Sequence, residues 1–166
     1  MFARGGPAIV IFAFLLPLCA TASASPTIWV WGDGSNGQLC RGDYSSSFVP
    51  TPIPSLTLPE NAAVTVYAGS FATFIVTNDS YGAPALLACG NNSAGLLGLG
   101  LGSPLSSPRP TRVTAATFPI ASMAVGTHAL ALTKSGTVYA WGDNSAGQLG
   151  RGFGAASWAP GGSPFT

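Results

Sequence analysis

A glycine-rich string of nine residues occurs three times in this chain of 166 residues, and no other feature constrains the fold as strongly. The copies read WGDGSNGQL, CGNNSAGLL and WGDNSAGQL. Their first glycines, Gly32, Gly90 and Gly142, are separated by 58 and 52 residues. A repeat of about 50 residues that is punctuated by turn-forming glycines is typical of β-propellers and solenoids. The chain is therefore expected to be an array of similar β units.

The residues before the third copy of the string have the pattern of short strands. Two strands are expected at 121–125 and 128–132, followed by a hairpin turn at Lys134–Gly136. Ala129 and Ala131 share one face of the second strand, where small side chains allow a neighbouring sheet to approach closely. The returning strand is expected at 137–141, with counterparts at 27–31 and 85–89. These segments predict an all-β fold.

The repeated loop is interpreted as architecture rather than chemistry. Its first glycine ends a strand, and the Asp or Asn that follows can accept a backbone hydrogen bond in an Asx turn. A second glycine permits another sharp bend, and a leucine anchors the loop in the core. These positions are Gly32, Asp33, Gly37 and Leu39 in the first copy, Gly90, Asn91, Gly95 and Leu97 in the second, and Gly142, Asp143, Gly147 and Leu149 in the third.

The stretch Val125–Gly152 resembles the repeat of the regulator of chromosome condensation family nearly throughout. The resemblance extends over essentially all of residues 27–160, with a degraded copy at 68–100 and the end of another at 29–42. It implies a β-propeller of seven four-stranded blades. The positions that carry it are Gly126, His128, Leu132, Gly136, Tyr139, Trp141, Gly142, Gly147, Gln148, Leu149 and Gly150.

On this resemblance the chain holds about two and a half repeats, with copies centred on 27–42, 63–100 and 121–152. Seven repeats of about 50 residues need about 350 residues. A ring that does not close leaves sheet edges unpaired. We therefore expect an all-β fold, a partial β-propeller of this repeat type, which is a fragment of a longer protein or needs partners to complete the ring.

Departures from the repeat pattern concentrate in the second copy. There Phe71 is interpreted as the replacement of His128, Cys89 replaces a tryptophan, and Leu96 replaces a glutamine. In the first copy, Cys40 stands where a glycine is expected.

Residues 1–24 are interpreted as a signal peptide. Arg4 is followed by an apolar run at 8–20 and by Ala22-Ser23-Ala24, which has the small residues of a cleavage site. The run of about 13 residues is shorter than the roughly 20 that span a bilayer. The alternatives are an uncleaved membrane anchor and a misassigned start codon. We expect a protein that is secreted or lies in the lumen of the secretory pathway, with repeats at 25–166 and no stable membrane span after cleavage.

Two cysteines and two glycosylation motifs depend on this location. Cys40 and Cys89 remain after cleavage, and disulfides form in an oxidising compartment. Their repeat positions differ, so the pairing is left open. Asn78-Asp79-Ser80 and Asn91-Asn92-Ser93 match the N-glycosylation motif. Asn78 is expected in an accessible hairpin turn, whereas Asn91 lies in the tight repeat loop, where its side chain has structural uses.

Composition and motifs argue against several functional classes. Charged residues make up 7% of the chain and the formal net charge is +1, so we expect no nucleic-acid partner. His128, the only histidine, is interpreted as structural, and Asp33 and Asp143 as equivalent loop positions rather than an acid–base pair. No zinc-ligand spacing, phosphate loop or dinucleotide motif occurs. We expect no catalytic residues, no cofactor, no metal and no enzyme activity.

The expected function is that of a non-enzymatic protein-binding β-propeller scaffold, because a rigid fold that presents loops is suited to gripping another macromolecule. The sequence does not identify the partner protein. The resemblance also implies a second role, guanine nucleotide exchange on a small GTPase or its regulation, which the fold alone does not confer. A signal peptide would separate the chain from cytoplasmic and nuclear GTPases and so favours the first role.

Overall fold

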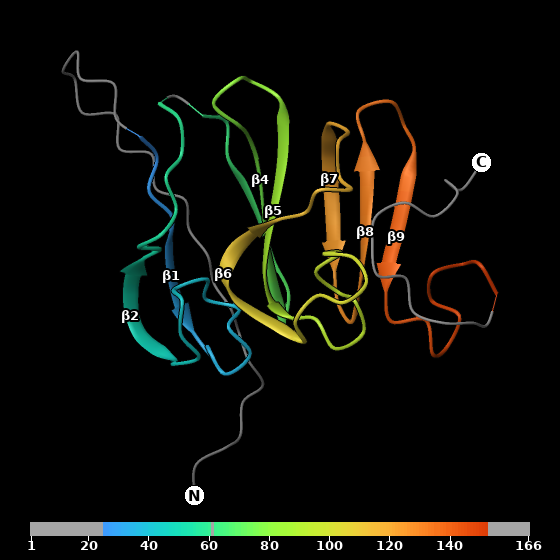
Figure 1. The fold of residues 1–166 in the computed structure, drawn as a ribbon, viewed down its shortest axis with the longest axis horizontal. Helices are drawn as coiled ribbons and strands as arrows, with labels where there is room; N and C mark the ends of the chain where they lie inside the picture. Colours follow the sequence, from blue (N-terminus) through green and yellow to red (C-terminus); the bar gives the residue numbers. More distant parts are fainter. Residues whose placement is uncertain (1–24, 61, 153–166) are drawn as a thin grey trace, which may run out of the picture.

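The computed structural model describes residues 25–60 and 62–152, which form nine β-strands in three antiparallel sheets (Figure 1). The described part of the chain contains no helix that is long and apolar enough to cross a membrane. The expected signal peptide at 1–24 lies outside the described residues. The strands are β1 (Trp29–Gly32), β2 (Ser47–Pro52), β3 (Thr65–Ala68), β4 (Ala72–Asn78), β5 (Pro84–Asn91), β6 (Ser106–Arg112), β7 (Ile120–Val125), β8 (His128–Thr133) and β9 (Val138–Gly142).

The three sheets stand side by side in chain order, as successive blades of a propeller (Figure 1). The central sheet has the strand order β3-β4-β5-β6 and is a complete blade. The first sheet pairs β1 with β2, which correspond to β5 and β6 of the central blade. The last sheet has the order β7-β8-β9, which correspond to β3, β4 and β5. The fold is an all-β partial propeller, and this prediction from the sequence is confirmed.

Two apolar clusters fill the spaces between the sheets. Ile75 belongs to the cluster between the first and second sheets, whereas Phe74 packs with Ala129 and Trp141 between the second and third. Phe74 and Ile75 are neighbours on β4, and successive side chains of a strand point to opposite faces. The strand β4 therefore packs against both neighbouring sheets. Ala129 and Ala131 are fully buried, which confirms that small residues on β8 let the sheets approach closely.

The register of the central sheet corrects one prediction. His128 on β8 is opposite Gly142 on β9. Gly90 on β5 is the counterpart of Gly142 in the repeated string, and it is opposite Ala72 on β4. Ala72, and not Phe71, therefore takes the place of His128 in the second copy.

The physical reason is a difference in turn length. In the third sheet, the Gly126 N–H donates to the His128 carbonyl over 2.9 Å. In the central sheet, the Gly69 N–H donates to the Ala72 carbonyl over 2.8 Å. The turn that begins at Gly69 thus contains one more residue, and counting along the sequence from the shared glycine reaches the wrong position.

Candidate protein-binding face

The three copies of the repeated string form loops that lie together at one end of the sheets (Figure 1). They follow β1, β5 and β9 and comprise residues 33–46, residues 91–105 with Asn91 as the last residue of β5, and residues 143–152. The turn at 69–71 lies at the same end, because the Phe71 carbonyl accepts a hydrogen bond of 2.8 Å from the Asn91 backbone N–H. We call these three loops and this turn the loop face.

Each loop is held by an Asx turn at its start. The Oδ1 atoms of Asp33, Asn91 and Asp143 accept hydrogen bonds from the backbone N–H two residues further on, at 3.0, 2.8 and 2.9 Å. This backbone hydrogen bond is the main reason why the pKa of Asp33 and that of Asp143 lie below the ordinary value. In the described part of the chain no hydrogen bond joins the two carboxylates, so each serves its own loop.

Two glutamines brace the first and third loops. Gln148 Nε2 donates to the Asp143 carboxylate over 2.7 Å, and its Oε1 accepts the Ala146 N–H over 2.8 Å. Gln38 makes the corresponding two bonds in the first loop, at 3.2 and 2.8 Å. Leu96 occupies this position in the second copy, so the second loop lacks the brace.

Two buried asparagines, which the sequence analysis did not single out, tie the loops to the core. Asn92 Oδ1 accepts the Leu97 N–H over 3.0 Å, and its Nδ2 donates to the Pro104 carbonyl over 2.9 Å. Asn144 makes the corresponding two bonds in the third loop, at 3.1 and 3.0 Å. The signal was an asparagine directly after the Asx-turn residue in both strings. The loop leucines Leu39, Leu97 and Leu149 are 1%, 0% and 1% exposed.

The two glycines that recur in every copy of the string have positive φ values. At Gly142, where φ is 102°, an added Cβ would lie only 2.9 Å from the His128 Cα. Both the conformation and the available space therefore require glycine at this position. The other φ values are 105° at Gly32, 122° at Gly90, 81° at Gly37, 75° at Gly95 and 76° at Gly147.

Side chains join the loops of successive blades to one another. Asn91 Nδ2 donates to Asn36 Oδ1 over 3.2 Å, between the second and first loops. The Tyr44 hydroxyl of the first loop and the Ser106 hydroxyl at the start of β6 form a hydrogen bond of 2.8 Å. These contacts fix the loops relative to one another, so the loop face is a preorganised surface.

Trp141 joins the third sheet to the second loop. Its buried indole Nε1–H donates to the Leu96 carbonyl over 2.9 Å, and its ring packs edge-to-face on Phe74 with centroids 6.1 Å apart. The Gln38 carbonyl is the counterpart of the Leu96 carbonyl at the preceding boundary between blades. There it accepts a hydrogen bond of 2.8 Å from the Thr73 hydroxyl.

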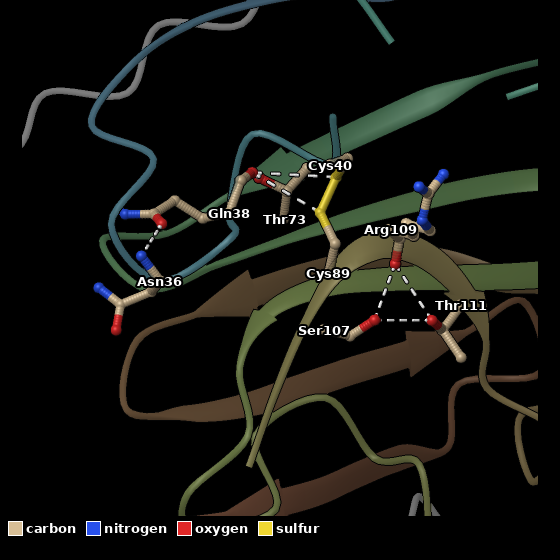
Figure 2. Close-up of a disulfide and its surroundings, with 8 residues drawn as sticks. All are labelled: Asn36, Gln38, Cys40, Thr73, Cys89, Ser107, Arg109 and Thr111. Atoms are coloured by element: carbon tan, nitrogen blue, oxygen red, sulfur yellow. Dashed lines mark hydrogen bonds between the residues drawn. A yellow bond between two sulfur atoms is a disulfide. The ribbon is translucent and has the colours of Figure 1, made fainter. Parts of the chain in front are cut away.

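A disulfide replaces the tryptophan at this first boundary. Cys89, at the position of Trp141, is bonded to Cys40 of the first loop, with Cα atoms 5.5 Å apart (Figure 2). Cys40 has a φ of 59°, the only positive φ outside glycine among the described residues, and its counterparts Gly98 and Gly150 have 69° and 67°. The sequence left the pairing open because the repeat positions differ. The structure pairs them because the loop of one repeat packs against a strand of the next.

Large apolar side chains are exposed on the loop face. Leu101 and Leu105 of the second loop are 84% and 67% exposed, Tyr44 is 50% exposed, and Phe71 is 41% exposed. Phe71 also lines a hollow of about 260 Å³ between the second and third loops, together with Asn91, Leu96 and Asp143. A single exposed apolar side chain is ordinary, whereas several that gather on one face are typical of a site that contacts another protein.

The described residues hold no group of three His, Cys, Asp or Glu side chains placed to bind a metal ion. His128 is half-buried at the start of β8, and its Nδ1 has no hydrogen-bond partner among the described residues. Asp143, which follows β9 nearby, is engaged by its own loop.

Two segments match models of one protein family. Residues 27–76 match a model described as Regulator of chromosome condensation (RCC1) repeat, and residues 124–148 match a second model of the same description. The first match runs from before β1 into β4 and so crosses from the first sheet into the second. The sequence repeat is therefore offset from the structural blade.

Two human relatives are large proteins. The chain is 38% identical over 125 residues to Probable E3 ubiquitin-protein ligase HERC6 of Homo sapiens. The aligned segment covers 74% of this chain and 12% of that protein. The chain is 35% identical over 135 residues to E3 ubiquitin-protein ligase HERC2 of Homo sapiens, with 81% and 3% covered. The chain thus spans a small part of each relative.

A solved structure has the same fold. The crystal structure of Prp20p from Saccharomyces cerevisiae, a protein that binds Gsp1p and histones, matches with a TM-score of 0.68. The identity is 22%, over 85% of this chain and 34% of that chain. At this identity the likeness establishes the propeller fold alone.

The relatives correct one prediction from the sequence. We expected no enzyme activity, yet both human relatives are named E3 ubiquitin-protein ligases. The segment shared with this chain is 12% of HERC6 and 3% of HERC2. A repeat array that lacks a catalytic motif can therefore belong to an enzyme whose catalytic part lies elsewhere in the protein. The expectation that the protein is not an enzyme was therefore wrong.

Proposed function

Because this chain is built from repeats of the regulator of chromosome condensation family, we propose that it is the protein-binding β-propeller part of a longer protein and that it works in the secretory or extracellular space. The observation that carries the binding role is the set of exposed apolar side chains on the loop face, above all Leu101 and Leu105. A few side chains supply most of the free energy of binding at protein interfaces, and fully burying an exposed leucine contributes about 1.5–3 kcal/mol.

The rigidity of the loop face supports the same role. The Asn91–Asn36 hydrogen bond and the Cys40–Cys89 disulfide hold the first loop against the second blade. A surface that is already ordered loses little conformational entropy when a partner binds, which strengthens binding without additional contacts.

The disulfide also supports the location. Cys40 and Cys89 are both fully buried at a boundary between blades, and disulfides persist mainly in oxidising compartments. A signal peptide at 1–24 would deliver the chain to such a compartment. The proposal of a longer protein rests on the relatives, since the chain spans 34% of the yeast propeller with the same fold.

The binding role is tested with the full chain, expressed with a tag in eukaryotic cells and cross-linked to its neighbours before capture. The Leu101→Ser/Leu105→Ser variant should lose the partners that the wild type captures. Tyr81→Ser, which removes an apolar side chain at the opposite end of the sheets, should keep them. Capture of the same partners by both variants would show that the loop face is not the binding surface.

The second candidate is regulation of a small GTPase, favoured by the likeness to the yeast propeller Prp20p, which binds Gsp1p. The two candidates differ in location. A fluorescent reporter fused to the C-terminus of the full chain should enter the secretory pathway if the first is right. A reporter found in the cytosol would contradict the location and favour the second candidate.

A further inference from the structure

We propose that Asn78 carries an N-linked glycan and that Asn91, which has the same sequence motif, does not. The inference rests on the proposed secretory location, because N-glycans are added to Asn-X-Ser/Thr motifs of chains that enter that pathway. The two motifs are indistinguishable as sequence, and the structure separates them by what each amide contacts.

The Asn78 side chain is free to carry a sugar. Asn78 is the last residue of β4, opposite Pro84 in the register, and its side chain is exposed. Ser80, the third residue of the motif, is also exposed. Neither side chain forms a hydrogen bond with another described residue. The amide nitrogen that would bear the glycan and the hydroxyl that the transferase requires are therefore both accessible.

The middle residue of this motif holds the turn. Asp79 Oδ1 accepts the N–H groups of Tyr81 and Ala83, at 3.0 and 2.9 Å, and Oδ2 accepts Arg112 Nη2 at 3.2 Å. The Asp79 N–H donates to the Ala83 carbonyl over 2.8 Å. Because Asp79 alone makes these contacts, a sugar on Asn78 requires no rearrangement of the turn.

The Asn91 side chain is already used. Its Nδ2, the atom that a glycan would modify, donates to Asn36 Oδ1 over 3.2 Å. Its Oδ1 accepts both the Ser93 N–H and the Ser93 hydroxyl, at 2.8 and 2.7 Å. The next residue, Asn92, is fully buried. A sugar on Asn91 would have to enter the contact between two loops, so folding of this motif opposes modification.

The two sites lie at opposite ends of the sheets. The turn between β4 and β5, which contains Asp79 and Tyr81, lies at the end away from the repeat loops (Figure 1). A glycan on Asn78 therefore leaves the loop face open to a partner. A glycan on Asn91 would stand on the loop face itself.

The test expresses the full tagged chain in eukaryotic cells and compares its electrophoretic mobility before and after peptide-N-glycosidase treatment. We expect one glycosidase-sensitive shift, lost in Asn78→Gln and in Ser80→Ala and retained in Asn91→Gln and in Ser93→Ala. Secretion of each variant reports on folding, and Ser93→Ala tests the second motif with the Asn91–Asn36 contact left in place. A shift that persists in Asn78→Gln, or disappears in Ser93→Ala, would overturn the proposal.

A second arm replaces residues 1–24 with an established signal sequence. If only this form is modified, and at Asn78, the proposed location fails while the choice between the two motifs stands. If this form is secreted without any glycan, the inference about Asn78 is wrong regardless of where the native chain resides.

Discussion

Trp141 donates its indole N–H to the carbonyl oxygen of Leu96 over 2.9 Å and so ties the third blade to the loop of the second. At the boundary between the first and second blades, two side chains of the second blade make the corresponding connections. The Thr73 hydroxyl donates to the Gln38 carbonyl, and Cys89, at the tryptophan position, is bonded to Cys40. The Trp141 hydrogen bond between the second and third blades is thus replaced, between the first and second blades, by the Thr73 hydrogen bond and the Cys40–Cys89 disulfide.

We predict that Trp141→Phe lowers the free energy of unfolding by about 1–3 kcal/mol, because the Leu96 carbonyl loses its buried donor and the core loses volume. Urea denaturation measures the change. Trp29→Phe is the matched control, since Trp29 is 40% exposed, and it should change stability by no more than about 0.5 kcal/mol. Equal effects in the two variants would contradict the assigned role of Trp141.

Removal of the disulfide in Cys40→Ala/Cys89→Ala should lower the free energy of unfolding by about 2–4 kcal/mol, because the bond closes a loop with a sequence separation of 49 residues. Dithiothreitol should destabilise the wild type and leave this variant unchanged. If the reductant affected both proteins equally, the disulfide would not be the group responsible.

The left-handed backbone at Cys40 provides a separate prediction. In the absence of the bond, Cys40→Gly/Cys89→Ala should be more stable than Cys40→Ala/Cys89→Ala by about 1–2 kcal/mol, because glycine adopts a φ of 59° without the steric cost paid by a Cβ. Thermal denaturation under reducing conditions compares the two variants. The order of stabilities is the decisive result, and its reversal would contradict the assigned backbone conformation.

Gly142→Ala should destabilise the protein more strongly than Gly136→Ala. Both glycines have a positive φ, 102° and 89°, so both substitutions pay a backbone cost of about 1–2 kcal/mol. A Cβ at Gly142 also meets the His128 Cα at 2.9 Å, whereas nothing lies within 4 Å of a Cβ at Gly136. The difference between their unfolding free energies, measured in urea, isolates the steric part.

Acid should loosen the third loop through Asp143. Its pKa is lowered in the folded state, chiefly by the Ser145 backbone N–H, so its contribution to stability is complete above the ordinary Asp pKa and is lost as the pH falls through the lowered value. Asp143→Asn should keep the Asx turn, as Asn91 does in the second loop, and should remove this part of the acid sensitivity. Urea midpoints at pH 7 and pH 3 test the prediction, and an unchanged pH dependence in the variant would contradict it.

Short-range features of the sequence predicted five of the nine described strands, β1, β5, β7, β8 and β9, and no range was expected for the other four. The expected segments 121–125, 128–132 and 137–141 correspond to Ile120–Val125, His128–Thr133 and Val138–Gly142 in the structure. The alternation of side chains and the glycine turns are local to one repeat unit, so both can be recognised in the sequence of each copy. The repeat also predicts the loops, since an Asp or Asn and two glycines recur at the same positions in each copy.

The partners of those loops required the tertiary structure. The register that places Ala72 opposite Gly90 depends on one extra residue in the turn after Gly69. No local sequence pattern indicates the length of this turn. The exposure of Asn78 and the engagement of Asn91 by Asn36 follow from where the loops of neighbouring blades meet.

Glycine spacing and strand alternation are properties of single repeat units, and they were therefore sufficient to predict an all-β array of regulator of chromosome condensation repeats. The Cys40–Cys89 disulfide became evident from the packed blades, since the two cysteines occupy different repeat positions and become neighbours when the loop of one repeat packs against a strand of the next. Contacts within a repeat can be predicted from the sequence of that repeat, whereas contacts between repeats depend on how the blades pack.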